Sequence, residues 1–329
     1  TEIYTLSLHD ALPILQGQVF GQGRIGMRIA GLVVYLRTKL RLPVRSIQAY
    51  LKTLHGLSLS VGEIVELTHA VSEQLQPQVE ALKTELHESK VVHADETGWR
   101  EAGDNGYCWG FMTTGPEAVH YFEYDGSRGH WVPERILGRP FRGYLVTDFY
   151  SAYNLLRLRH QRCWVHLLRA LHELKESYPD HVEVSPWATA VHQVYTDAQA
   201  WLKEHPDPTG QERRDEYRHL FRRACVLGQQ YALQYEHPCC TLAKRLLRHQ
   251  DELFRFVLVP GMAADNNLAE RSLRPLVIMR KISGGSRSPK GTKTRLALFS
   301  LFSTWAARGQ EPFQYCLSLL QAPVVSAPT

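Results

Sequence analysis

Apolar positions recur every three or four residues along the N-terminal part of the chain, which is the period of one helix face. Pro43 and Gly56 interrupt the pattern, and Ser60 with Glu63 has the form of a capping box that opens a new helix. Such a region fits either a helix-turn-helix DNA reader or a plain helical bundle, and the pattern leaves both open. The helices are expected at residues 25–40, 46–54, 60–75 and 79–86, within a helical region spanning residues 15–89.

After residue 90 the pattern changes to short β-branched and aromatic runs, which are typical of strands. Two of these runs end in an isolated aspartate, at Asp95 and at Asp148. Two others flank Gly115-Pro116 and predict a hairpin. Three strands, a short helix and a fourth strand together predict an α/β core. The expected elements are residues 90–95, 107–114, 118–124, 131–137 for the helix, and 143–148.

The 122 residues from Asp148 to Glu270 are too many for a simple connection, and they carry helical periodicity. A large helical insertion is therefore expected between these two residues. Beyond it, Pro275 should kink or end the helix that bears Glu270, and residues 283–286 read as a flexible loop. The predicted organisation is a first core part at residues 90–170, an insertion at 171–258, and a core completion with a basic C-terminal region at 259–329.

Composition fits a globular protein, because 44% of the 329 residues are apolar. The net charge of +5 is unevenly spread: residues 271–310 hold nine lysines and arginines and no acid. That stretch is either a contact for a phosphate backbone or a solvated basic surface. No apolar run is long enough for a membrane span, and the six cysteines lack paired spacing, so we expect a soluble cytoplasmic protein with reduced thiols.

The candidate chemistry lies in three carboxylates. Strand alternation favours Asp95 over its neighbour Glu96 as the acid on the functional face. In the motif at residues 264–274, Asp265 can cap a helix on which Glu270 has apolar residues behind it. Each acid alone has a plain structural explanation, as a turn, a cap or a surface ion pair. Three acids from separate segments can together hold two magnesium ions about 4 Å apart for phosphodiester chemistry.

Cys163 and His166 are three residues apart, a spacing common among zinc ligands. The second half of a tetrahedral site is missing from the sequence, which makes a structural zinc the less favoured interpretation. On a helix the two side chains would share one face.

Taken in order, several segments resemble the bacterial DDE transposases of insertion-sequence family sixty-six. The resemblance extends from about residue 24 to about residue 320, and the ordered set is much more specific than any single segment. Cys163 and His166 belong to it, as a family feature near the catalytic core that would position the insertion or assist at the site. The matching segments are residues 93–97, 147–153, 163–166, 265–271 and 280–281.

The resemblance implies a ribonuclease-H-like mixed sheet core whose catalytic and metal-binding acids are Asp95, Asp148 and Glu270. It implies two Mg²⁺ or Mn²⁺ ions, double-stranded DNA as transposon ends and target, and a homo-oligomer assembled on DNA in the nucleoid. The expected reaction is strand cleavage followed by strand transfer. The residues expected to contact DNA are Asn267, Arg271, Arg274, Arg280, Lys281 and Arg287.

Two other classes stay open at this stage. One is a DNA-binding remnant or regulator without catalysis, and the other is a hydrolase that uses Asp95 and Glu96 as an acid and base pair. Residues 4–14 resemble a translated sequencing adapter, so residues 1–14 are set apart as an artefact. The natural protein is then expected to carry DNA-recognition and coiled-coil portions that this chain lacks.

Overall fold

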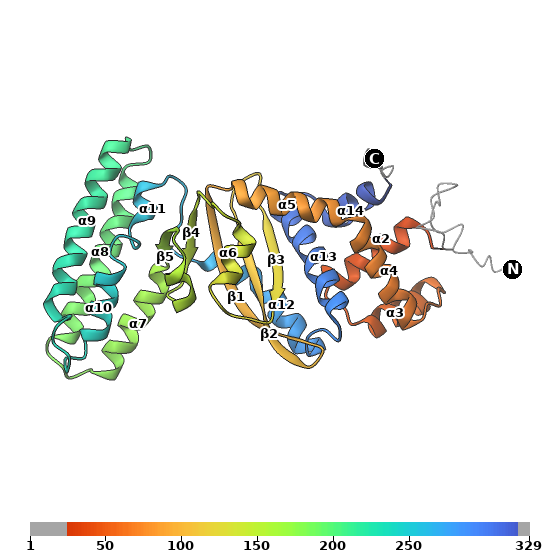
Figure 1. The fold of residues 1–329 in the computed structure, drawn as a ribbon, viewed down its shortest axis with the longest axis horizontal. Helices are drawn as coiled ribbons and strands as arrows, with labels where there is room; N and C mark the ends of the chain where they lie inside the picture. Colours follow the sequence, from red (N-terminus) through yellow and green to blue (C-terminus); the bar gives the residue numbers. More distant parts are fainter. Residues whose placement is uncertain (1–24, 322–329) are drawn as a thin grey trace, which may run out of the picture. The chain divides into compact units, whose positions relative to one another are not determined.

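The computed structural model describes residues 25–321, so the expectation for residues 1–14 lies outside the described residues (Figure 1). The chain forms two compact units whose segments interleave along the sequence. Within the described residues, the first unit consists of residues 25–87, 96–128 and 271–321. The second unit consists of residues 88–95 and 129–270.

A five-stranded sheet has the order β3-β2-β1-β4-β5. Strands β4 and β5 run parallel to β1, whereas β2 and β3 pair antiparallel. The turn from β1 to β2 consists of Ala102 and Gly103, which both have positive φ angles of 52° and 102° and form a tight hairpin connection. The strands are β1 Val91–Glu101, β2 Asp104–Met112, β3 His120–Asp125, β4 Tyr144–Thr147 and β5 Arg159–Arg162.

The α/β class, the hairpin and the strand that leads into Asp148 are confirmed. The prediction that the first strand ends at Asp95 is wrong, because β1 continues to Glu101. Strand β5 was not predicted, since its sequence Arg-His-Gln-Arg has no apolar residue. Three of its side chains are nevertheless buried, and each of them makes at least one hydrogen bond.

The first unit contains the predicted N-terminal helices and two helices near the C-terminus. Helix α4 opens with the predicted capping box. The Ser60 hydroxyl accepts a hydrogen bond from the backbone N–H of Glu63, and the Glu63 carboxylate accepts one from the backbone N–H of Ser60. Helix α13 packs along β3 (Figure 1). The Ser300 hydroxyl accepts a hydrogen bond from the backbone N–H of Phe122, and the Thr304 hydroxyl accepts one from the backbone N–H of His120. The helices of this unit are α2 Met27–Thr38, α3 Val44–His55, α4 Val61–Gln74, α5 Gln76–Glu88, α13 Pro289–Ala307 and α14 Pro312–Gln321.

Helices α2, α3 and α4 pack against one another. DNA reading by these helices stays a prediction. Within residues 25–321, no helix combines the length and apolar character that a bilayer crossing requires.

The second unit holds the predicted helical insertion. Helices α8, α9 and α10 lie side by side and bury an apolar core that includes Trp187 and Leu220 (Figure 1). The helices here are α6 Trp131–Leu137, the 3-10 helix η1 Ser151–Leu155, α7 Trp164–Ser177, α8 Val184–Glu204, α9 Gly210–Tyr231, α10 Cys240–Arg248 and α11 Arg255–Leu258.

Helix α12 Asn267–Ser283 carries Glu270 in its first turn and contains Pro275. The helix does not end at Pro275, which corrects the alternative that it would stop there. A proline removes one N–H donor, and the carbonyl it leaves without an intrahelical partner belongs to Arg271, which is exposed to water. The lost hydrogen bond can therefore be replaced by solvent.

Candidate functional site

Three parallel strands, β1, β4 and β5, lead towards Asp95, Asp148 and Cys163. In β1 and β4, the pairing ends with His93 and Val146; continued by two residues, the same register would bring Asp95 opposite Asp148, which lies one residue past the end of β4. In β4 and β5, Thr147 pairs with Arg162, so the next level pair is Asp148 and Cys163. Side chains at level positions of neighbouring parallel strands point to the same face, and such strands lie about 4.8 Å apart. That the two aspartates share one edge of the sheet therefore stays a prediction.

Asn266 ties the start of α12 to this edge of the sheet. Its side chain is buried, with Nδ2 donating to the carbonyl of Ala94 at 2.8 Å and Oδ1 lying 3.2 Å from Nδ1 of His93. Burial lowers the pKa of His93 to about 4, so the imidazole is neutral and Nδ1 donates to the amide oxygen. The backbone N–H of Asn266 donates to Sγ of Cys163 at 3.2 Å. The segment before α12 is thus fixed to β1 and to the residue after β5.

Glu270 follows Asn266 by one helical turn. Ala269 and Leu273 are buried behind it, as the helical pattern predicted. Oε1 of Glu270 is buried and has no hydrogen-bond partner among the described residues. Nε2 of His166 lies 3.7 Å from this oxygen. A buried carboxylate oxygen without a donor is costly unless a cation or a water binds it, so the geometry suits a metal ligand.

Arg162 is a residue of the site that the sequence did not reveal. The guanidinium is fully buried, and NH1 donates to Oγ1 of Thr147 at 3.1 Å and to the carbonyl of Asp148 at 3.0 Å. NH2 donates to Asn154 at 2.8 Å, and Nε to Glu252 at 2.7 Å. Arg162 therefore fixes the backbone at Asp148. A single arginine in a short polar run has no pattern that would identify it beforehand.

The partner of Arg162 is an ionised carboxylate. Burial raises the pKa of Glu252, but hydrogen bonds from His249 and Arg162 outweigh that effect and lower the pKa to about 2. Glu252 thus stays charged and keeps the buried guanidinium paired.

His160, in the middle of β5, predicts a pH dependence of stability. Its ring is buried and bonds the carbonyl of Leu156 at 3.2 Å. Burial, reinforced by the positive charge of Arg162, lowers its pKa from 6.5 to about 4. Between these values the unfolded chain binds a proton that the folded chain does not, so stability falls as the pH drops from 6.5 towards 4. We expect a loss of roughly 2 kcal/mol from this residue between pH 7 and pH 5.

Urea unfolding of the wild type and of His160→Leu at both pH values measures this contribution. The pH-dependent loss should be smaller in the variant by about the stated amount. An equal loss in both proteins would show that His160 does not carry the effect.

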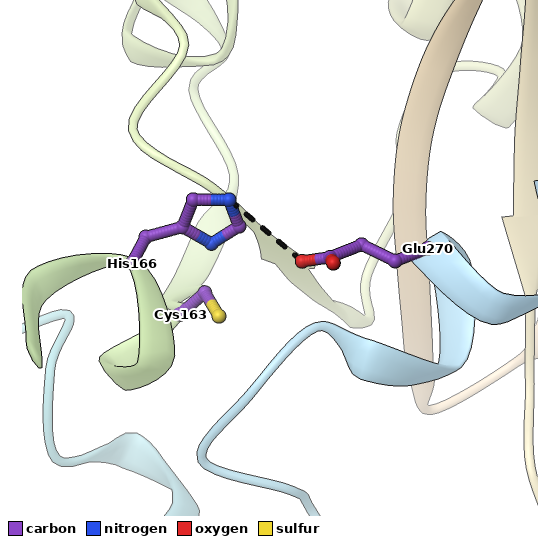
Figure 2. A group of neighbouring side chains, drawn as sticks. All are labelled: Cys163, His166 and Glu270. Carbon is purple, nitrogen blue, oxygen red and sulfur yellow. Dashed lines mark ion pairs between the residues drawn. The ribbon is translucent and has the colours of Figure 1, made fainter. Parts of the chain in front are cut away.

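The side chains of Cys163 and His166 lie close to that of Glu270. Figure 2 shows the His166 ring above the Cys163 thiol, with one edge turned towards the Glu270 carboxylate. One ligand atom from each of the three residues lies within 4.8 Å of the other two. Cys163 is buried, and burial raises the pKa of its thiol. The third side chain of this cluster therefore comes from α12, more than a hundred residues away from the Cys-His pair.

The residues predicted to contact DNA differ in their exposure to solvent. Arg271, Arg274, Lys281 and Arg287 are exposed, whereas Asn267 and Arg280 are partly buried. Arg280 donates to the carbonyl of Gly98 and so supports β1. Four cations are therefore accessible to a phosphate backbone, and Arg280 has a structural partner as well.

The loop at residues 283–286 is fixed rather than flexible, which corrects the prediction. Ser286 is buried and bridges the end of β1 through backbone bonds to Arg100 and Ala102. Gly285 has a φ angle of 107°, and a Cβ at this position would collide with the Arg100 carbonyl. Only glycine fits such a position without strain. The loop therefore holds Arg287 at a defined place beside it.

The alternative acid and base pair is weakened by the environment of Glu96. Its carboxylate is 2% exposed and accepts two hydrogen bonds from Arg128, at 2.8 and 2.6 Å. An acid held in that ion pair is stabilised in its charged form and is shielded from a substrate. Asp95, rather than Glu96, remains the candidate for chemistry.

Together these features define a class: a mixed α/β protein whose sheet order is compatible with a ribonuclease-H-like core, with one acid inside β1 and another directly after the neighbouring parallel strand β4. The comparison with known families agrees, because the family described as "Transposase IS66 family" matches residues 22–294. The chain belongs to this transposase family.

Two relatives come from Sinorhizobium fredii (strain NBRC 101917 / NGR234). "Uncharacterized protein y4jO" is 29% identical over 157 residues, which cover 47% of this chain and 46% of the relative. "Uncharacterized protein y4qI" is 25% identical over 300 residues, which cover 79% of this chain and 52% of the relative. The chain thus spans about half the length of the curated relatives it matches.

Proposed function

We propose that this chain catalyses metal-dependent DNA strand cleavage and strand transfer during transposition of an insertion sequence. The observation that carries the proposal is the parallel pairing of β1 with β4, whose register would continue to Asp95 and Asp148, together with Asn266, which ties the helix of Glu270 to β1. Membership of a transposase family supports it. The sheet order supports a ribonuclease-H-like core.

Asp95, Asp148 and Glu270 would hold two Mg²⁺ or Mn²⁺ ions. The donor set fits these metals, because all three residues offer carboxylate oxygens, and Oε1 of Glu270 is buried without a hydrogen-bond partner among the described residues. The ions, when bound, activate a water or a 3′ hydroxyl and stabilise the leaving oxygen.

The surrounding residues have positioning and binding roles. Arg162 holds the backbone of Asp148, and Asn266 fixes the start of α12, so that the acids keep their places during the reaction. The exposed cations Arg271, Arg274 and Lys281, together with Arg287, would bind DNA phosphates. Asn267 and Arg280 would add polar contacts at the same helix.

The proposal is tested with supercoiled plasmid that carries the terminal sequences of the element. The chain should nick this plasmid in Mg²⁺ or Mn²⁺ and not after treatment with EDTA. A chain that binds the ends but never nicks them in either metal would be a catalytically inactive DNA-binding remnant. Native gels of the DNA complex would show whether the proposed homo-oligomer forms.

A further prediction concerns the phosphate contacts. Lys281→Ala or Arg287→Ala should weaken binding to all duplex sequences alike and reduce the slope of log K against log salt by about 1. Fluorescence anisotropy over a salt series measures both quantities. Lys203→Ala, an exposed lysine on α8, is the matched control and should leave the slope unchanged. An unchanged slope for both test variants would remove these residues from the DNA contact.

A further inference from the structure

We propose that Cys163, His166 and Glu270 form a binding site for a transition-metal ion of the zinc class. The site would have three protein ligands and an open fourth position, and it is chemically distinct from the proposed magnesium site. All three residues belong to the second unit and lie on two elements, with Cys163 and His166 at the start of α7 and Glu270 in the first turn of α12 (Figure 2).

The spacing of the ligand atoms fits one ion. A thiolate, an imidazole and a carboxylate bind zinc at about 2.0 to 2.3 Å, which places neighbouring ligands of a tetrahedral ion about 3.4 to 3.8 Å apart. His166 Nε2 and Glu270 Oε1 are 3.7 Å apart, and one atom from each of the three residues lies within 4.8 Å of the others. Small side-chain rotations would therefore close the three ligands around an ion.

The polar atoms of the cluster lack other partners. Nδ1 of His166 and Oε1 of Glu270 are both buried and have no hydrogen-bond partner among the described residues. The sulfur of Cys163 accepts the backbone N–H of Asn266, and one ligand atom from each of the three residues lies within 4.8 Å of the other two. A cation bound here would satisfy Oε1 of Glu270 and would take one ring nitrogen of His166 as a further ligand.

A second cluster, of His181, Glu183 and His237, shows the contrast. Its ligand atoms also lie within 4.8 Å of one another. There, the N–H of Cys239 donates to Nδ1 of His237, so the proton of this imidazole sits on Nε2, which donates to Glu183 at 3.2 Å. His237 is thus satisfied in a tautomer whose Nε2 lone pair is not available to a metal. This cluster is complete without an ion.

Ligand type decides the metal. Thiolate and imidazole select Zn²⁺ or Co²⁺, whereas Mg²⁺ requires oxygen ligands. Glu270 is common to both sites, so an ion held by Cys163 and His166 would remove this carboxylate from the magnesium site. That consequence, inhibition of cleavage by zinc, rests on the proposed function; binding of the metal does not.

The test uses Co²⁺ as a spectroscopic stand-in for zinc, with the full chain, free of DNA and in a thiol-free buffer. One equivalent of Co²⁺ should produce an absorption band of sulfur-to-cobalt charge transfer, which Zn²⁺ removes and excess Mg²⁺ does not. Cys163→Ser should abolish the band, and His166→Ala or Glu270→Gln should weaken Co²⁺ binding at least tenfold. Circular dichroism confirms that each variant is folded.

Matched controls separate this site from others. Cys225→Ser replaces a thiol on α9, and His172→Ala replaces an exposed imidazole on α7; both should keep the band and the affinity. A wild-type chain without the band, or a band that survives Cys163→Ser, would overturn the proposal. Failure of the proposed function is recognised separately, because Asp148→Ala should leave the cobalt band unchanged whether or not the wild type cleaves DNA.

Discussion

Asp148→Ala is expected to lower DNA cleavage by a factor on the order of 10³ or more while duplex binding changes by less than about twofold. The same result is expected for Asp95→Ala and Glu270→Ala. Each variant removes a carboxylate that would hold a metal ion, and none removes one of the exposed cations that would bind phosphates. Single-turnover nicking and anisotropy on the same duplex measure the two effects separately.

Asp148→Asn and Asp180→Ala are the controls for this experiment. The asparagine keeps the shape and the hydrogen bond that Asp148 Oδ1 accepts from the backbone N–H of Tyr150 at 2.9 Å, but it removes the charge. It should be as inactive as alanine. Asp180 is exposed in the loop before α8, and its replacement should leave cleavage unchanged. Cleavage by Asp148→Ala at the wild-type rate would refute the assignment.

Arg162→Ala is expected to destabilise the protein by about 3 to 5 kcal/mol, the range for breaking a buried ion pair by removing one partner. The variant leaves Glu252 charged without its guanidinium and removes donors from Thr147, Asp148 and Asn154. Urea unfolding measures the loss. Because the backbone at Asp148 loses its support, cleavage should also fall under conditions in which the variant is folded.

Arg218→Ala is the matched control for stability. Arg218 pairs with Asp215 on α9, where both side chains are more than half exposed, and solvent screening leaves such a pair little effect on stability. The double variant Arg162→Ala with Glu252→Gln should be less destabilised than the sum of the two single variants, since removing both charges leaves neither unpaired. Additive losses would contradict a direct pair.

The sequence predicted the elements that obey simple periodicity. The helix bearing Glu270 and the strand before Asp148 were recognisable because apolar residues follow one period in each. Strand β5 was not recognisable, because its buried positions are His160, Gln161 and Arg162, whose burial depends on hydrogen bonds to distant segments. A polar strand in a core has no hydrophobic pattern to detect.

The predicted site likewise depends on contacts between residues that are far apart in the sequence. The acids could be nominated locally, but the strand pairing on which their approach would depend joins residues 53 apart, such as His93 and Val146. The link from Asn266 to His93 and the approach of Glu270 to His166 are likewise long-range contacts. Local sequence indicates which residue types are present, whereas the tertiary contacts decide which of them meet.

The most direct test of the central claim is a crystal structure of chelator-treated, zinc-free protein soaked in Mn²⁺, with anomalous scattering to locate the metal. We expect manganese bound by carboxylate oxygens of both Asp95 and Asp148, with Glu270 completing the site. Manganese bound elsewhere, or protein without manganese at these acids under conditions that support cleavage, would contradict a shared metal site.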